Sequence, residues 1–120
     1  MTTLPRLNAT EVEEQIAVVQ YCTARHIPVF HIPNGGSRYV REAARLKQQG
    51  VMPGVPDLMI PVPRNGYHGL FVEMKRKKGG RTTTEQYYWR DLLSEQGYKS
   101  LICYGADAAI EALDTYVKGG

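Results

Sequence analysis

The chain has 120 residues, with 15 lysine and arginine residues against 12 aspartate and glutamate residues, and a formal net charge of +3. A hydrophobic fraction of 42% and a charged fraction of 22% are typical of a globular domain and argue against a disordered or fibrous protein. No apolar stretch approaches the roughly 18 residues of a membrane helix, and no signal-peptide core is present, so we expect one cytoplasmic domain over residues 1–120.

The first half of the chain predicts two helices separated by a short strand. Thr10 and Glu13 have the spacing of a capping box, which predicts the start of a helix over residues 11–25. A strand over residues 29–32 and a second helix over residues 38–49 follow after a proline and a glycine-rich loop. The residues that fall on one face of the first helix at helical spacing are Val12, Ile16, Val19 and Thr23.

The second half predicts a hairpin followed by a helix, a strand and a closing helix. Two strands, over residues 57–60 and 70–74, are separated by Asn65-Gly66, a strong signal for a tight turn. The order α-β-α-β-β-α-β-α predicts an α/β fold with a mixed sheet flanked by helices. The last three elements are expected over residues 83–96, 101–104 and 107–117. The cysteines Cys22 and Cys103 lack metal-ligand spacing, so we expect them to be reduced and buried.

The hairpin carries the residues that indicate chemistry. Glu73 and Lys75 are two positions apart on one strand and therefore share a face, while the turn brings Asp57 back beside them. Two carboxylates there can hold Mg²⁺, and a neighbouring lysine can steady a hydroxide or a developing phosphate charge. The alternative interpretation is that Asp57 is only a turn residue and that Glu73 and Lys75 form an ordinary surface ion pair. The apolar flanks favour a site, because buried carboxylates cost free energy unless a cation compensates them. The pattern is the minimum for metal-assisted phosphodiester hydrolysis.

The motifs GVPDLMI at residues 54–60 and GLFVEMKRKKG at residues 69–79, with Gln86 on the next helix, resemble the PD-(D/E)XK nuclease superfamily. More narrowly they resemble its virus-type replication-repair nuclease (VRR-NUC) family, as do Thr10-Glu11 with Gln15 and the segment HIPNGG at residues 31–36. The resemblance implies a restriction-endonuclease-like core, Mg²⁺ (or Mn²⁺) and DNA cleavage. The residues that it implies for catalysis or metal binding are Asp57, Glu73, Lys75 and the Met74 carbonyl.

Several side chains have two interpretations. The helix carboxylate that often completes the metal site in this superfamily is Glu11 by family spacing, with Glu14 as the alternative. Gln86 is either a capping residue at the third helical position or an amide that contacts water, phosphate or a catalytic carboxylate. His31 is either a hydrogen-bonded structural residue or a base or ligand. Among Tyr87, Tyr88 and Trp89, we expect two buried side chains and one that is partly exposed.

Basic residues beside this site predict contacts with DNA phosphates rather than with base edges. Asn34 and its neighbouring glycines form either a simple turn or a phosphate-binding loop. We expect a homodimer acting on branched or four-way-junction DNA, in a bacterial or phage-infected cell, with no nucleotide cofactor. The alternative is a catalytically inactive, nuclease-like DNA-binding module. The basic residues expected to contact DNA are Arg38, Arg41 and Arg45, and then Arg76, Lys77, Lys78 and Arg81.

Overall fold

The computed structural model describes residues 7–33 and 42–119 of the chain. The element order is the expected α-β-α-β-β-α-β-α. Among the described residues, none of the helices has the length and apolar character needed to cross a membrane. The elements are α1 (Glu11–Ala24), β1 (Phe30–His31), α3 (Ala43–Gln48), β2 (Leu58–Ile60), β3 (Leu70–Lys75), α4 (Thr84–Glu95), β4 (Lys99–Tyr104) and α5 (Ala106–Lys118).

The four strands form one mixed sheet in the order β1-β2-β3-β4. β2 is antiparallel to both of its neighbours, and Asn65 and Gly66, with φ angles of 52° and 83°, form the tight turn on the connection from β2 to β3. β3 and β4 are parallel, and α4 makes the crossover between them. The register places Glu73 opposite Ile102, and Lys75 opposite Tyr104.

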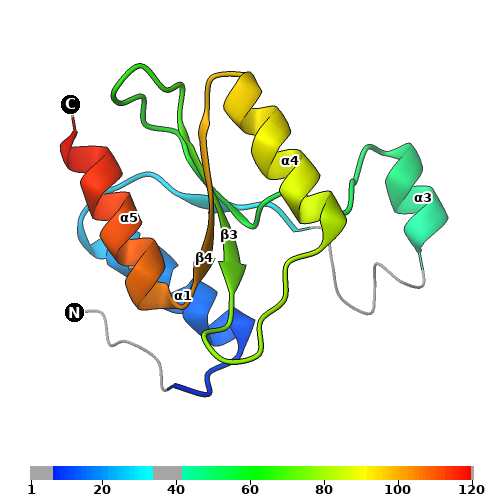
Figure 1. The fold of residues 1–120 in the computed structure, drawn as a ribbon, viewed down its shortest axis with the longest axis horizontal. Helices are drawn as coiled ribbons and strands as arrows, with labels where there is room; N and C mark the ends of the chain where they lie inside the picture. The colour runs from blue at the N-terminus through cyan, green and yellow to red at the C-terminus, as the bar shows by residue number, and fades with distance from the viewer. Residues whose placement is uncertain (1–6, 34–41, 120) are drawn as a thin grey trace.

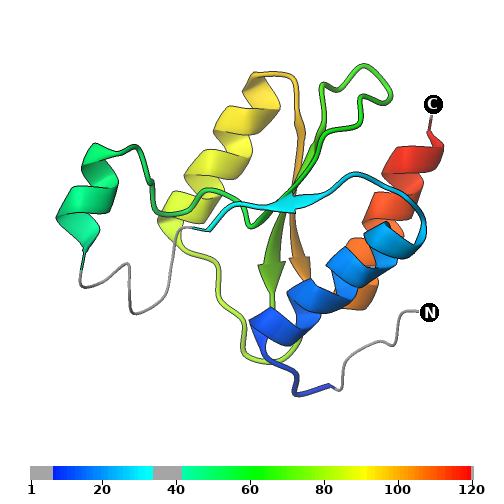
Figure 2. The same cartoon turned by 180° about the vertical axis from the view of Figure 1, so that it is seen from behind.

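The sheet lies between helices, with α1 and α5 on one side of β3 and β4 and α4 on the other (Figures 1 and 2). Leu70, Val72 and Met74 alternate along β3 and form the core with buried residues of α1 and α5, such as Val18 and Leu113. The intervening positions, Glu73 and Lys75, therefore face the side of α4. The mixed α/β class is the one that the sequence predicts.

The buried face of α1 differs from the apolar stripe read in the sequence. The helix begins at the expected capping box, but Val12 and Ile16 are 67% and 50% exposed. The buried side instead includes Glu14, Val18 and Cys22. Glu14 can be buried because its carboxylate accepts backbone N–H groups from the loop after β3 and from the start of α5, and this tertiary pairing favours turning that face of α1 inward.

Two further expectations change. Within the described residues the second helix is α3, Ala43–Gln48, and it stands apart from α1 and α5 at one end of the molecule (Figures 1 and 2). Residues 34–41 lie outside the described part, and Asn34, Arg38 and Arg41 with them.

On α4, the expectation of two buried aromatic side chains is wrong. Tyr87 and Tyr88 are 44% and 58% exposed, and Trp89 is half-buried, because α4 covers mainly β4 and leaves its outer side to solvent.

Candidate active site

Asp57 is fixed at the start of β2 by neighbours on both sides. Its backbone carbonyl accepts hydrogen bonds of 2.8 Å from the Ile32 N–H and from Nδ1 of His31. A carbonyl oxygen only accepts, so His31 makes this bond with its proton on Nδ1. The Gln15 amide nitrogen lies 3.1 Å from the same Nδ1, and because it too is a donor, this approach is not a second hydrogen bond of that nitrogen. On the other side, the Met74 N–H donates to Oδ2 of Asp57 over 2.8 Å. These contacts hold the Asp57 carboxylate against β3 and give His31 a structural task.

Glu73 and Lys75 lie on one face of β3, both buried, beside the Asp57 carboxyl group. Nζ of Lys75 is 3.9 Å from Oε2 of Glu73. Burial, the Asp57 charge and a hydrogen bond to Asp57 raise the pKa of Glu73 to about 9, against the opposing effect of Lys75. At neutral pH and without a cation, Glu73 therefore carries a proton. The Asp57 charge opposes ionisation of Glu73, and a hard cation, which prefers carboxylate oxygens as ligands, would relieve that opposition.

Gln86 joins α4 to this pair, because its side chain both completes a helix cap and contacts Glu73. Its side-chain oxygen accepts the Thr83 N–H at 2.9 Å, and the Thr83 hydroxyl accepts the Gln86 N–H, which completes a capping box. The amide nitrogen then donates to Oε2 of Glu73 over 2.9 Å. A single side chain thus starts α4 and orients a carboxylate of the site.

The donor set of the site fits Mg²⁺ or Mn²⁺, because it consists of oxygen atoms. The Lys75 carbonyl accepts from the Gly105 N–H on the side of β4, so the Met74 carbonyl faces the opposite way, toward Asp57. The Met74 carbonyl oxygen and the carboxylates of Asp57 and Glu73 are therefore the oxygens that could hold the ion. Within residues 7–33 and 42–119, no group of three His, Cys, Asp or Glu side chains is arranged to bind a metal. Additional ligands would therefore have to include backbone or water oxygens.

The two helix carboxylates have different surroundings. Both oxygens of Glu14 are occupied, since Oε1 accepts the Ala106 N–H at 3.0 Å and Oε2 accepts the Lys77 N–H at 3.3 Å. Glu14 therefore ties α1 to the start of α5 and to the loop after β3. Glu11 is exposed, and its negative charge contributes to the raised pKa of Glu73. Of the two, Glu11 has the carboxylate that is free of these structural bonds, and its role in the site stays a prediction.

Glycines allow two loops to pack tightly around the site. Gly54 has a φ angle of 90°, and a Cβ there would lie 2.5 Å from the backbone of Glu85 in the first turn of α4. A Cβ on Gly80 would lie 3.1 Å from Cβ of Lys75 and 2.6 Å from the Arg76 carbonyl oxygen. The GVPD segment therefore presses on the helix that carries Gln86, and the loop after β3 covers Lys75.

Tyr104 is a neighbour of the site that the sequence does not reveal. It pairs with Lys75 across β3 and β4, so the two side chains leave the same face of the sheet. The ring is 41% exposed, and its hydroxyl is 2.6 Å from Oγ1 of Thr82. Only the parallel register brings Tyr104 to Lys75, and no local motif encodes that register.

The basic residues after β3 do not form a uniform set. Arg76, Lys78 and Arg81 are exposed, whereas Nζ of Lys77 forms a 3.0 Å ion pair with Asp107. Lys77, through this pairing, holds the pKa of Asp107 below its usual value. On α3, the Arg45 side chain is 75% exposed and lies 3.8 Å from Glu42. Lys77 is therefore an anchor of the loop, and the other cations are directed to solvent.

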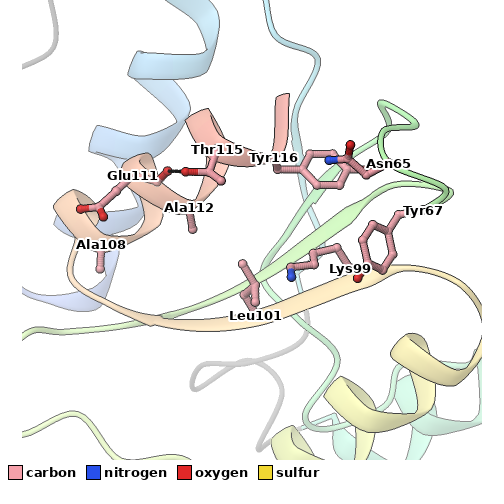
Figure 3. A pocket seen from close by; sticks show the side chains of 9 residues that line it. All are labelled: Asn65, Tyr67, Lys99, Leu101, Ala108, Glu111, Ala112, Thr115 and Tyr116. Carbon is pink, nitrogen blue, oxygen red and sulfur yellow. Dashed lines mark hydrogen bonds between the residues drawn. The ribbon is translucent and has the colours of Figure 1, made fainter. Parts of the chain in front are cut away.

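A cavity of about 430 Å³ lies elsewhere, between β4, α5 and the hairpin. Figure 3 shows Lys99 and Leu101 of β4 facing residues of α5 across this space. Lys99 and Leu101 alternate with Ser100 and Ile102, so they leave the face of the sheet opposite to Glu73 and Lys75. The cavity is consequently separate from the carboxylate site.

The mixed sheet with two carboxylates and a lysine at the end of a strand is a nuclease-type fold. The family model described as "VRR-NUC domain" matches residues 13–107, and the chain belongs to this family. A solved structure described as "VRR_NUC domain protein" is similar, with a TM-score of 0.83 and 30% sequence identity, covering 94% of this chain and 92% of that chain. Among curated proteins, none matches the chain significantly.

Proposed function

We propose that this protein is a metal-dependent DNA endonuclease that hydrolyses phosphodiester bonds. The observation that carries the proposal is the convergence of Asp57, Glu73, Lys75 and Gln86 at the end of β3, where Glu73 and Lys75 are buried. Burying acidic and basic groups together costs free energy that a surface ion pair does not incur. An arrangement with that cost is typical of a site with a chemical role.

Each side chain has a separate part in the proposed reaction. Asp57, Glu73 and the Met74 carbonyl hold Mg²⁺ or Mn²⁺, which when bound supplies charge stabilisation and an activated water. The Lys75 ammonium group orients the attacking water and offsets negative charge on the phosphate in the transition state. Gln86 keeps Glu73 in position, and Glu11 adds a further carboxylate from α1.

The proposed substrate is branched DNA, including the four-way junction. The exposed cations Arg76, Lys78 and Arg81 follow β3 in the segment that leads to α4, and Arg45 is exposed on α3. They show no base-reading pattern, which supports phosphate contacts and selection by shape. A binding module without catalytic activity is the competing function. The buried Glu73–Lys75 pair and its hydrogen bond from Gln86 favour catalysis, because binding phosphates alone needs neither carboxylate.

We further propose a homodimer formed through the exposed side of α1. Val12 and Ile16 are one turn apart on that side, and Leu7, just before the helix, is 65% exposed. Exposed apolar side chains gathered in this way are typical of interaction surfaces. The closing helix is a weaker candidate, because Ala109 and Leu113 of α5 are fully buried in the core. Two symmetric copies would bring two active sites to one junction.

The test is cleavage of a matched panel of DNA substrates. Linear duplex, flap, splayed-arm and four-way-junction DNA are incubated with the protein in Mg²⁺ and in Mn²⁺, and the products are resolved on denaturing gels. We expect cleavage of the branched substrates in preference to the linear duplex, and its loss in EDTA. Asp57→Asn, Glu73→Gln and Lys75→Ala should each remove most activity without loss of folding. Wild-type rates in any of the three variants would contradict the nuclease assignment.

A further inference from the structure

The ring of Tyr104 is an exposed aromatic surface at the border of the site. Its backbone is paired with that of Lys75, and neighbouring strands are about 4.8 Å apart. Lys75 itself is buried, with the Cβ position of Gly80 against it, whereas 41% of Tyr104 is accessible. A nucleotide whose phosphate lies at Glu73 and Lys75 therefore has a base within reach of this ring.

The orientation of the ring is fixed by contacts at both of its ends. Tyr104 is the last residue of β4, so its backbone is held by the sheet. Its side-chain hydroxyl is hydrogen-bonded to Oγ1 of Thr82, in the loop that leads into α4. A side chain held at Cα and at its hydroxyl loses little further rotational freedom when a ligand packs on it.

From this geometry we propose that Tyr104 is a stacking surface for an unpaired base next to the phosphate that is cut. Bases inside a continuous duplex already stack on both faces, whereas a base at a branch point has a free face that an aromatic side chain can cover. Lys75 and the exposed Arg76 supply positive charge for the adjoining backbone. This inference rests on the proposed nuclease function and assigns its preference for branched DNA to one side chain.

Binding to fluorescein-labelled splayed-arm DNA and to linear duplex of equal length, measured by anisotropy in EDTA, separates stacking from charge. Tyr104→Leu removes the aromatic surface and should weaken binding of the splayed arm roughly 5- to 100-fold, with little change on the duplex. Tyr104→Phe keeps the ring and should retain most of the affinity. The matched control is Tyr88→Leu, because Tyr88 is 58% exposed but lies about 200° around α4 from Gln86 and should not contribute.

A second readout uses only the wild-type protein and does not depend on the folding of a variant. 2-Aminopurine is placed at the unpaired nucleotide beside the branch, and in a second DNA at a paired position in the arm. Stacking on Tyr104 should quench the fluorescence of the unpaired probe on binding and leave the paired probe unchanged.

Equal quenching at both positions, or equal affinity losses of Tyr104→Leu on both DNAs, would overturn this inference alone. Wild-type protein that binds neither DNA would instead overturn the proposed function on which the inference rests.

Discussion

Glu73 and Asp57 bring two carboxyl groups together on the side of β3 that faces α4. The pKa of Glu73 is raised to about 9, first by burial and then by the Asp57 charge. An unfolded chain releases that proton near pH 4.5, so the folded protein binds one proton more than the unfolded protein between these two values. At high pH the ionised site therefore lowers the free energy of unfolding, unless a cation replaces the proton.

This difference predicts how the metal-free protein responds to pH. In EDTA, wild-type stability relative to Glu73→Gln should be greatest near pH 5 and should fall as the pH rises toward 9, by as much as about 1 kcal/mol per pH unit. Thermal unfolding of both proteins across this range measures the difference, and comparison with the variant cancels other titrating groups. A constant difference between the two proteins from pH 5 to 9 would show that Glu73 titrates normally.

Two adjacent lysines in the loop after β3 are expected to have different functions. Lys78 contacts DNA phosphate, whereas Lys77 anchors the loop through its ion pair with Asp107. Lys78 is exposed, so Lys78→Ala should lower the slope of log affinity against log salt by about 0.9 on duplex DNA. Lys77 is paired with Asp107, so Lys77→Ala should change the slope less and lower the melting temperature more. Salt titrations of DNA binding, with thermal unfolding, measure both effects. Equal slopes for Lys78→Ala and the wild-type protein would place this part of the loop away from DNA.

At the scale of the elements, α1 is joined to the start of α5 and to the loop after β3 by the buried carboxylate of Glu14. Glu14→Ala should destabilise the protein by about 3 kcal/mol, because two backbone N–H groups lose a charged acceptor. Glu11→Ala is the matched control on the same helix, since Glu11 is exposed, and it should unfold like the wild-type protein while cleaving DNA more slowly. Urea unfolding and cleavage rates test the pair. Equal stability of the two variants would contradict the structural role of Glu14.

The elements that the sequence predicts well are those with local signals. The capping boxes at Thr10 and Thr83 start α1 and α4, and Asn65-Gly66 makes the turn between β2 and β3. Asp57, Glu73 and Lys75 could also be brought together by reasoning, because a hairpin and the alternation of side chains along a strand determine their positions. Each of these rules acts over a few residues.

Features that depend on distant pairing were not accessible from the sequence. The buried face of α1 is set by Glu14, whose partners are the N–H groups of Lys77 and Ala106, far along the chain. The position of Tyr104 beside Lys75 follows from the register of two parallel strands joined by a helix. Helical periodicity predicts that the side of α1 with Val12 is buried, because the spacing of apolar residues gives no sign that the Glu14 carboxylate is buried instead.

For the whole molecule, the exposed apolar side of α1 predicts association. Light scattering at micromolar concentration should give a dimer, and mapping of nicks on a four-way junction should give symmetric pairs. Ile16→Glu places a charge in the apolar surface and should yield a monomer that nicks single strands. Ser94→Glu, at an exposed position of α4 on the other side of the sheet, should remain dimeric. A wild-type monomer that nicks one strand only would contradict the dimer and the junction preference while leaving the nuclease proposal intact.

The central claim is that Asp57 and Glu73 form a site for a divalent cation, and calorimetric titration of the free protein with Mn²⁺ tests it most directly. At pH 7 we predict saturable binding with proton release, because Glu73 must lose its proton to coordinate the ion. Asp57→Ala should abolish that binding while the protein stays folded. The same heat of binding in the wild-type protein and in Asp57→Ala, or none in the wild-type protein, would contradict the account.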